Sequence, residues 1–306
     1  EYDWEHDPVN PRNWSWGKMD SGYTQVSLFT FVTPLASSIM APGLPYVAIK
    51  YGITDPIVLA LTLSIFLLSF AIGPLFAGPL SEVYGRLWVL HLGNLFFLAF
   101  NLGCALSPNI VSLIVFRFLG TPPIACGPSV VSDLSAERER ALALALFSVG
   151  PLIGPAVGPA IGGFIAELVG VEYVFYVIVA ISGVAEMLGI PLLRESYAPV
   201  IRLRRDTMTL DPEKLATGHP ALPYQIGKCT YLWLNLKQPV ILFTRSLICF
   251  ILSLYMALMY GIYYLIFATF PDLFSNVYHF DIGIGGLTYI GIGLGFLIVA
   301  HFRKLI

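Results

Sequence analysis

Two charged residues, Arg117 and Glu186, stand inside long apolar stretches of this sequence. An ionisable side chain is costly inside a membrane, so it usually faces a cavity or a partner and marks a functional site. Burial also favours the neutral form of a carboxyl group, which a proton carrier requires. We therefore expect Arg117 to have a function and Glu186 to carry a proton. The alternatives are a snorkelling or structurally paired Arg117, and a Glu186 that reaches water near the end of its helix.

A second unusual feature is a glycine and proline run within residues 150–163. Its members are Gly150, Pro151, Gly154, Pro155, Gly158, Pro159, Gly162 and Gly163. Glycines four apart share one helix face and form a groove for a neighbouring helix. Interior prolines free carbonyls four residues earlier, which neighbouring helices in a bilayer can satisfy. The run predicts a bent, closely packed and moving transmembrane helix. Static packing alone is the alternative.

The composition indicates an all-α integral membrane protein. Hydrophobic residues make up 57% of the chain and charged residues 12%, against about half and a quarter in soluble domains, and the mean hydropathy is +0.77. The net charge of -2 argues against a nucleic-acid partner. Histidines and cysteines show no metal-ligand spacing, and the glycine run lacks the lysine of a phosphate-binding loop. We expect no enzyme, cofactor or metal site.

Apolar spans of membrane-crossing length divide the chain. They fall near residues 22–41, 57–77, 88–106, 110–132, 141–166, 172–193, 241–268 and 283–300. The predicted domains are a tail (1–21), a six-helix bundle (22–193), a polar central loop (194–240) and a partial second bundle of two helices (241–306). With a cytoplasmic N-terminus, all 17 Lys and Arg residues except Lys50 and Arg117 fall on the cytoplasmic side, as the positive-inside rule requires.

Five motifs, in order along the chain, resemble the fungal drug:proton antiporter branch of the major facilitator superfamily. They are residues 7–15 (DPVNPRNWS), the loop 78–86 (GPLSEVYGR), Arg117 with Gly120, the run 150–163, and Ser253–Ala257 followed by Tyr260, Gly261 and Tyr264. The resemblance implies the major facilitator fold, with a complete six-helix N-terminal bundle and the first two helices of the C-terminal one. The sequence that follows Arg117, at residues 120–123 (GTPP), is a few residues shorter than the corresponding segment of the family. This difference predicts a shortened fourth helix.

The resemblance also implies roles for residues. Gly78, Glu82, Gly85 and Arg86 would form a latch between helices in one conformation, and Arg117 would couple proton movement to substrate movement. The helix of residues 150–163 would seal one side of the central cavity. From the residues themselves we expect polar cavity contacts from Asn94 and Asn101, which are seven apart on one face, and stacking from Tyr255, Tyr260 and Tyr264. Packing or an interfacial belt is the alternative for these aromatic residues.

The function predicted from the sequence is proton-coupled export of drugs or other small organic molecules by alternating access. We expect a monomer in the plasma membrane, with the vacuolar membrane as the alternative. Members of the superfamily have twelve helices, so the second hypothesis is a truncated or mis-spliced product that inserts in membranes and carries nothing. The third is a facilitator for sugars or metabolites.

Overall fold

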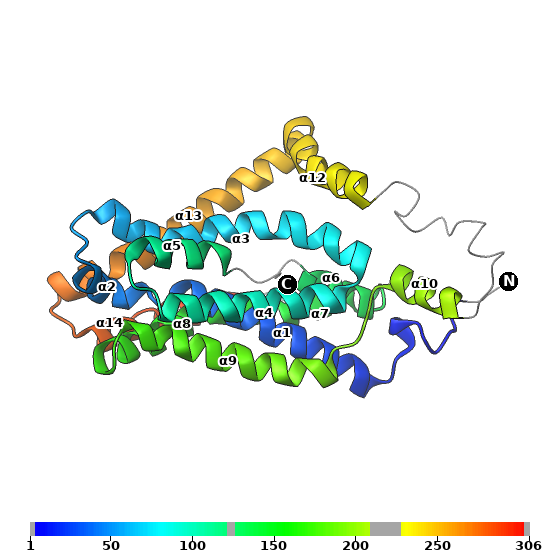
Figure 1. Cartoon of the computed structure of the whole chain (residues 1–306), viewed down its shortest axis with the longest axis horizontal. Coiled ribbons are helices and arrows are strands. Elements are labelled where there is room, and N and C mark those ends of the chain that lie inside the picture. Colours follow the sequence, from blue (N-terminus) through cyan, green and yellow to red (C-terminus); the bar gives the residue numbers. More distant parts are fainter. Residues whose placement is uncertain (1–3, 121–125, 209–227, 303–306) are drawn as a thin grey trace.

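The computed structural model describes residues 4–120, 126–208 and 228–302, and in these ranges every regular element is a helix. Figure 1 shows an elongated bundle whose long helices run roughly parallel to its long axis. We call the end with α2 and α14 the α2 end, and the opposite end, with α10 and the N-terminal tail, the α10 end.

The helices begin and end where the local sequence requires it. Asp55 caps α3, since its carboxylate accepts the N–H of Ile57, and Asn109 forms a capping box with Ser112 at the start of α5. The elements are η1 (Pro11–Asn13), α1 (Trp16–Ser38), η2 (Ala41–Gly43), α2 (Leu44–Tyr51), α3 (Pro56–Tyr84), α4 (Arg86–Ala105), α5 (Ile110–Leu119), α6 (Cys126–Leu134), α7 (Arg140–Phe147), α8 (Val149–Leu168), α9 (Val171–Leu192), α10 (Ala198–Met208), α12 (Lys228–Arg245), α13 (Leu247–Asn276), α14 (Ile282–Leu287) and α15 (Ile290–Phe302).

Six helical stretches among the described residues are long and apolar enough to cross a membrane. They are Trp16–Tyr51, Pro56–Tyr84, Arg86–Ala105, Arg140–Leu168, Val171–Leu192 and Leu247–Asn276. This confirms the prediction of an all-helical, multi-pass membrane protein. Between the long helices lie buried apolar clusters, the larger of which runs from the α1–α2 region through α3, α4 and α9.

Three predicted spans differ from the structure. The continuous helix predicted near residues 110–132 is wrong: α5 ends at Leu119 and α6 begins at Cys126, with residues 121–125 outside the described ranges. The span near 283–300 is divided into α14 and α15, both short. The helix predicted from residue 241 begins at Leu247, because the preceding residues through Arg245 belong to α12. Pro122 and Pro123 follow the first break in the sequence and glycines cluster around the second, and both residue types weaken a continuous helix. At the third, Ser246 caps the start of α13.

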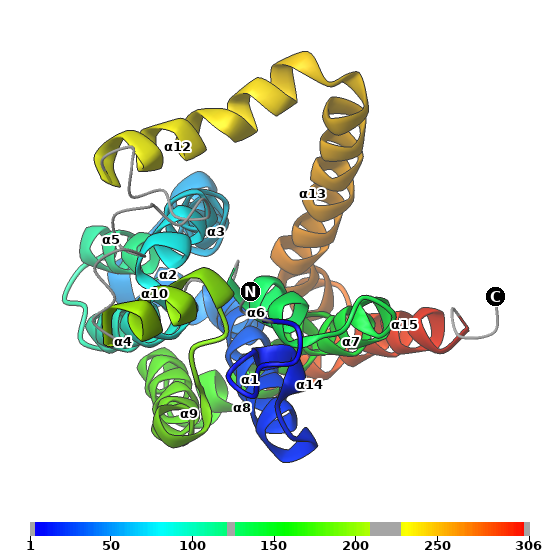
Figure 2. The ribbon, with the colours of Figure 1, turned by 90° about the vertical axis from the view of Figure 1, so that its right-hand side faces the viewer.

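Helix α8 is packed on two sides by other helices. It packs against α1 on one side and against α14 and α15 on another, while α9 lies beside α4 and α1. Figure 2, viewed from one end, shows α3, α4, α5 and α9 on one side of α1 and α8, whereas α13 rises apart from them and joins α12. The first half of α13 is therefore exposed, and its second half reaches the bundle near η2 and α14.

Candidate functional site

Arg117 lies in the last turns of α5 and is only 3% exposed. Its Nη2 donates to the carbonyl oxygen of Ser37 at 3.5 Å, and its Nη1 lies 3.9 Å from the sulfur of Met40. The guanidinium also faces the rings of Phe66 and Phe175, at 5.4 and 5.7 Å from their centroids. We call these four residues the arginine cage; α1, α3, α9 and the segment after α1 supply them.

The charge of Arg117 has no ionic partner among the residues that the structure describes. Its buried Nε atom has no hydrogen-bond partner either. A buried cation without a carboxylate costs several kcal/mol, which cation–π contacts and weak hydrogen bonds only partly offset. Tyr264 of α13 reaches the cage as well, because its hydroxyl lies 3.0 Å from the Ser37 hydroxyl. The cage is thus the place where α13 meets the buried charge.

Glu186 lies elsewhere, between α9 and α4. It is 5% exposed, its Oε1 lies 2.6 Å from Nδ1 of His91, and its Oε2 accepts a hydrogen bond from Nδ2 of Asn94 at 2.7 Å. We call Glu186, His91 and Asn94 the acid cluster. The water-exposed alternative for Glu186 does not describe this geometry, since the carboxylate is covered and both of its oxygens have partners. Asn94, expected to line a substrate cavity, instead holds this carboxylate.

The two buried charges are not brought together. Phe175 touches the guanidinium of Arg117, and Glu186 follows it eleven positions later on the same helix. At about 1.5 Å of rise per residue the two positions are about 16 Å apart along α9, on the same face of the helix. The arginine cage therefore lies toward the α2 end and the acid cluster toward the α10 end.

The loop 78–86 forms a network at the α10 end. Arg86 pairs with Asp133 of α6 at 3.1 Å and donates to the Ser81 hydroxyl at 2.6 Å. Glu195, after α9, accepts the backbone N–H groups of Arg86 and Leu87 and so caps α4. We call this set the latch network. Gly85 has a φ of 99°, and a Cβ there would overlap the Glu195 carboxylate, which explains why glycine is needed.

Glu82 is not paired with Arg86, although the two lie four apart. Its carboxylate accepts the Tyr231 hydroxyl of α12 at 2.5 Å, so the loop is tied to the helix that precedes α13. Burial raises the pKa of Tyr231, and the hydrogen bond to the Glu82 carboxylate adds to this. Burial also raises the pKa of Tyr197 to about 12; its ring faces the Arg86 guanidinium at 4.9 Å. Both tyrosines are therefore neutral at physiological pH.

The distance between α1 and the glycine face of α8 decreases toward the α2 end. The nearest atom to an added Cβ lies at 3.5 Å for Gly150, 2.8 Å for Gly154 and 2.6 Å for Gly158. For Gly162 the Cβ would overlap the Ile39 carbonyl. On the neighbouring face, Gly163 lies against the backbone of α14. Helices α1, α8 and α14 therefore converge at the α2 end, where only glycine fits.

One carbonyl freed by proline has found a partner. Pro159 has no N–H to offer the carbonyl of Pro155, four residues earlier. The Ser38 hydroxyl of α1 lies 3.2 Å from that oxygen, within hydrogen-bond distance. Helix α8 consequently stays continuous through Pro155 and Pro159, as expected for a helix whose neighbours satisfy its freed carbonyls.

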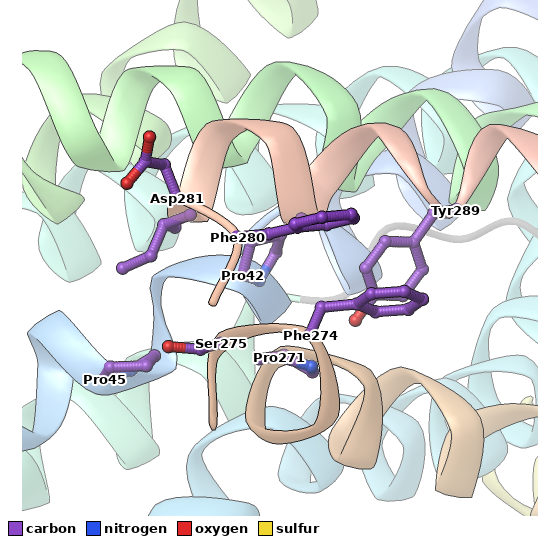
Figure 3. A pocket seen from close by; sticks show the side chains of 10 residues that line it. Pro42, Pro45, Pro271, Phe274, Ser275, Phe280, Asp281 and Tyr289 are labelled. Carbon is purple, nitrogen blue, oxygen red and sulfur yellow. The ribbon is translucent and has the colours of Figure 1, made fainter. Parts of the chain in front are cut away.

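The remaining cavity candidates do not converge. Tyr255 and Tyr260 lie on the outlying half of α13 and are 57% and 56% exposed, and Asn101 donates to the Phe97 carbonyl of its own helix. Tyr264 alone reaches the bundle. A small apolar pocket lies at the α2 end between η2, α13 and α14. Figure 3 shows that the Asp281 carboxylate points away from the aromatic rings that line this pocket. This pocket offers little polar chemistry.

Residues missed by sequence reasoning complete each cluster: His91, Ser37, Asp133, Glu195 and Tyr231. Apart from His91, none stands out locally, since each acts through a helix distant in sequence. Glu186 and His91, for example, are 95 positions apart. An ionisable residue inside a predicted span was the available signal for His91.

A multi-pass helical bundle with ionisable side chains buried between its helices defines the class of polytopic membrane proteins to which transporters belong. Residues 26–306 match the family model of the Major Facilitator Superfamily, and the chain belongs to that superfamily.

Relatives and solved structures agree with this assignment. The chain is 40% identical to the MFS-type transporter atr4 of Stereocaulon alpinum, over 97% of this chain and 55% of that protein. It is 39% identical to the efflux pump vrtL of Penicillium aethiopicum, over 99% and 61%. The xylose transporter XylE from E. coli, partially occluded and inward-open, shares the fold with a TM-score of 0.66 at 15% identity, covering 94% of this chain and 72% of XylE. The chain spans between 55% and 64% of the length of the curated relatives it matches.

Proposed function

We propose that this chain serves proton-coupled export of small organic molecules by alternating access. The observation that carries the proposal is Arg117, a buried cation without an ionic partner at the meeting point of α1, α3, α9 and α13. Such a charge is retained where it acts on a substrate or on proton movement. Curated relatives named efflux pumps support the direction of transport.

The arrangement of the helices fits a state open toward the α10 end. Helices α1, α8 and α14 converge at the α2 end, whereas the first half of α13 stands apart toward α12. The excess of lysine and arginine residues toward the α10 end supports a cytoplasmic position for that end. Closing the bundle there would bring the exposed first half of α13 against the other helices.

The test uses the chain itself, reconstituted in liposomes. An imposed pH gradient should drive ethidium across the membrane, and trapped pyranine should report proton movement in the opposite direction. Arg117→Gln should abolish both signals while the protein remains inserted and folded. Ethidium movement without proton movement would favour the facilitator hypothesis. An inserted chain that moves neither would contradict the proposal and favour the inactive product.

A further inference from the structure

We propose that His91 and Glu186 form a proton-binding site in which Glu186 stays ionised and the incoming proton binds Nε2 of His91. The part that the site plays in transport rests on the function proposed above, whereas proton binding stands on the geometry alone. The two side chains come from α4 and α9, which pack along each other, and they are 13% and 7% exposed.

The hydrogen bonds of the acid cluster fix where one proton lies. Nδ1 of His91 and Oε1 of Glu186 are 2.6 Å apart, and a bare ring nitrogen and a carboxylate oxygen are both acceptors. A proton must therefore lie between them. Oε2 accepts from Nδ2 of Asn94 at 2.7 Å, so that oxygen does not carry the proton. The resident proton is confined to the contact between Nδ1 and Oε1.

This confinement leaves one atom ready to accept a second proton. In the proposed resting state the pair holds this one proton, and it lies on Nδ1, because a ring with neither nitrogen protonated would be an imidazolate anion. The neutral ring then has a free lone pair on Nε2. Binding a proton there forms one N–H bond and converts the ring to an imidazolium beside the carboxylate. The cluster passes from one net negative charge to none. Neutralisation of a buried charge by one proton is the change that lets a carrier move its site between two environments.

No other ionised side chain competes at the site among the described parts of the neighbouring helices. Facing α9 from α1 is the neutral Gln25, whose amide donates to the Ala185 carbonyl at 2.5 Å. Lys18 and Asp20 of α1 are exposed further toward the α10 end. The only titratable residue of α8, Glu167, lies near its opposite end and accepts the N–H of Gly283.

The other charged residues of α4 and α9 do not contact the pair either. On α4, Arg86 lies five positions before His91 and is engaged by Asp133 and Ser81. On α9, Glu172 lies at the other end of the helix and pairs with Lys50. The proton is thus held by the pair itself and not by a wider network of charges.

Nitrogen-15 NMR of the histidine-labelled 306-residue chain in detergent tests the protonation scheme directly. The His91 signal is assigned by its loss in His91→Gln. We expect the Nδ1–H tautomer at neutral pH and a doubly protonated ring when the buffer is acidified. In Glu186→Gln the ring loses the carboxylate that partners its doubly protonated form, so that form should appear only in more acidic buffer than in the wild-type chain. An Nε2–H tautomer in the wild-type chain, or unchanged behaviour in Glu186→Gln, would overturn the proposal.

Proton flux in liposomes separates this inference from the proposed function. His91→Gln should reduce proton movement at least tenfold, while His279→Asn should leave it unchanged, because His279 lies outside the bundle and its φ of 55° suits asparagine. If the wild-type chain moves no ethidium, the proposed function fails and the NMR result still decides proton binding. Undiminished proton flux in a folded His91→Gln chain that moves ethidium would overturn the coupling role.

Discussion

Arg117 and Glu186 are both buried in the bundle, yet they are not paired: the ring of Phe175 that faces Arg117 lies about 16 Å along α9 from Glu186. Each charged group is therefore contacted by its own set of neighbours. Aromatic rings and a backbone carbonyl contact the guanidinium of Arg117, whereas a histidine and an amide contact the carboxylate of Glu186. Communication between the two clusters has to pass through α9, α4 or a movement of the helices themselves.

Replacing the arginine should stabilise the protein while removing its function. In Arg117→Met the apolar side chain would occupy a cage already formed by Met40, Phe66 and Phe175. Removing an uncompensated buried charge should raise the free energy of unfolding by about 1–3 kcal/mol. Thermal unfolding in detergent measures the stability, and ethidium efflux should be lost.

Arg117→Lys is the matched control, since it keeps the charge and loses the planar stacking on the two rings. It should be no more stable than the wild-type chain. A marked loss of stability in Arg117→Met would show that the arginine stabilises the fold, which would contradict the expected gain in the free energy of unfolding.

Gly158 should not tolerate even a methyl group. Its added Cβ would lie 2.6 Å from the Ser38 hydroxyl and 2.8 Å from the Leu35 carbonyl oxygen, so α1 and α8 would have to separate. We expect Gly158→Ala to lower the free energy of unfolding by about 1–3 kcal/mol, and Gly158→Leu to abolish transport in a chain that still inserts. Gly183→Ala on α9 is the control, because nothing lies within 4 Å of its Cβ. Equal stability of the two alanine variants would refute the close packing of α1 on α8.

These cases show how far the sequence alone reaches. The spacing of Gly150 to Gly162 is local information, so it predicted a closely packed helix face, and the single acid in an apolar span singled out Glu186. The partners of Glu186 were not predictable, because they depend on the pairing of α4 with α9, over 90 positions away. Asn94 was expected to contact a cavity, but its amide donates to Glu186, because the packing of α4 on α9 decides what that helix face meets.

The contact between loop 78–86 and α12 should depend on the hydroxyl of Tyr231. Tyr231→Phe removes the donor to Glu82 and should cost about 0.5–1.5 kcal/mol, or more because the acceptor is charged. Hydrogen exchange of the α12 backbone should become faster in the variant, with α4 and α9 unchanged. Tyr255→Phe, on the exposed half of α13, is the control. Unchanged exchange in α12 would mean that the contact does not hold this helix.

The N-terminal tail is fixed to α10 by charge, and its docking should resist mild acid. Asp7 accepts the N–H of Val9 at 2.9 Å and pairs with Arg205. The backbone hydrogen bond from Val9, assisted by Arg205, holds the pKa of Asp7 below its ordinary value of 3.8. A lowered pKa gives a stabilising contribution that is present above the unfolded-state value and is lost as the pH falls through the folded-state value.

Docking of the tail should therefore be constant between about pH 5 and 8 and weaken only below about pH 4. Spin labels at Glu5→Cys and Arg204→Cys, both exposed positions, report the separation of the tail and α10. In Asp7→Asn the label distances should be broader at every pH, and the acid transition should vanish, because no carboxylate remains to be protonated. A tail that detaches near pH 6 in the wild-type chain would contradict the lowered pKa and would point to a different titrating group.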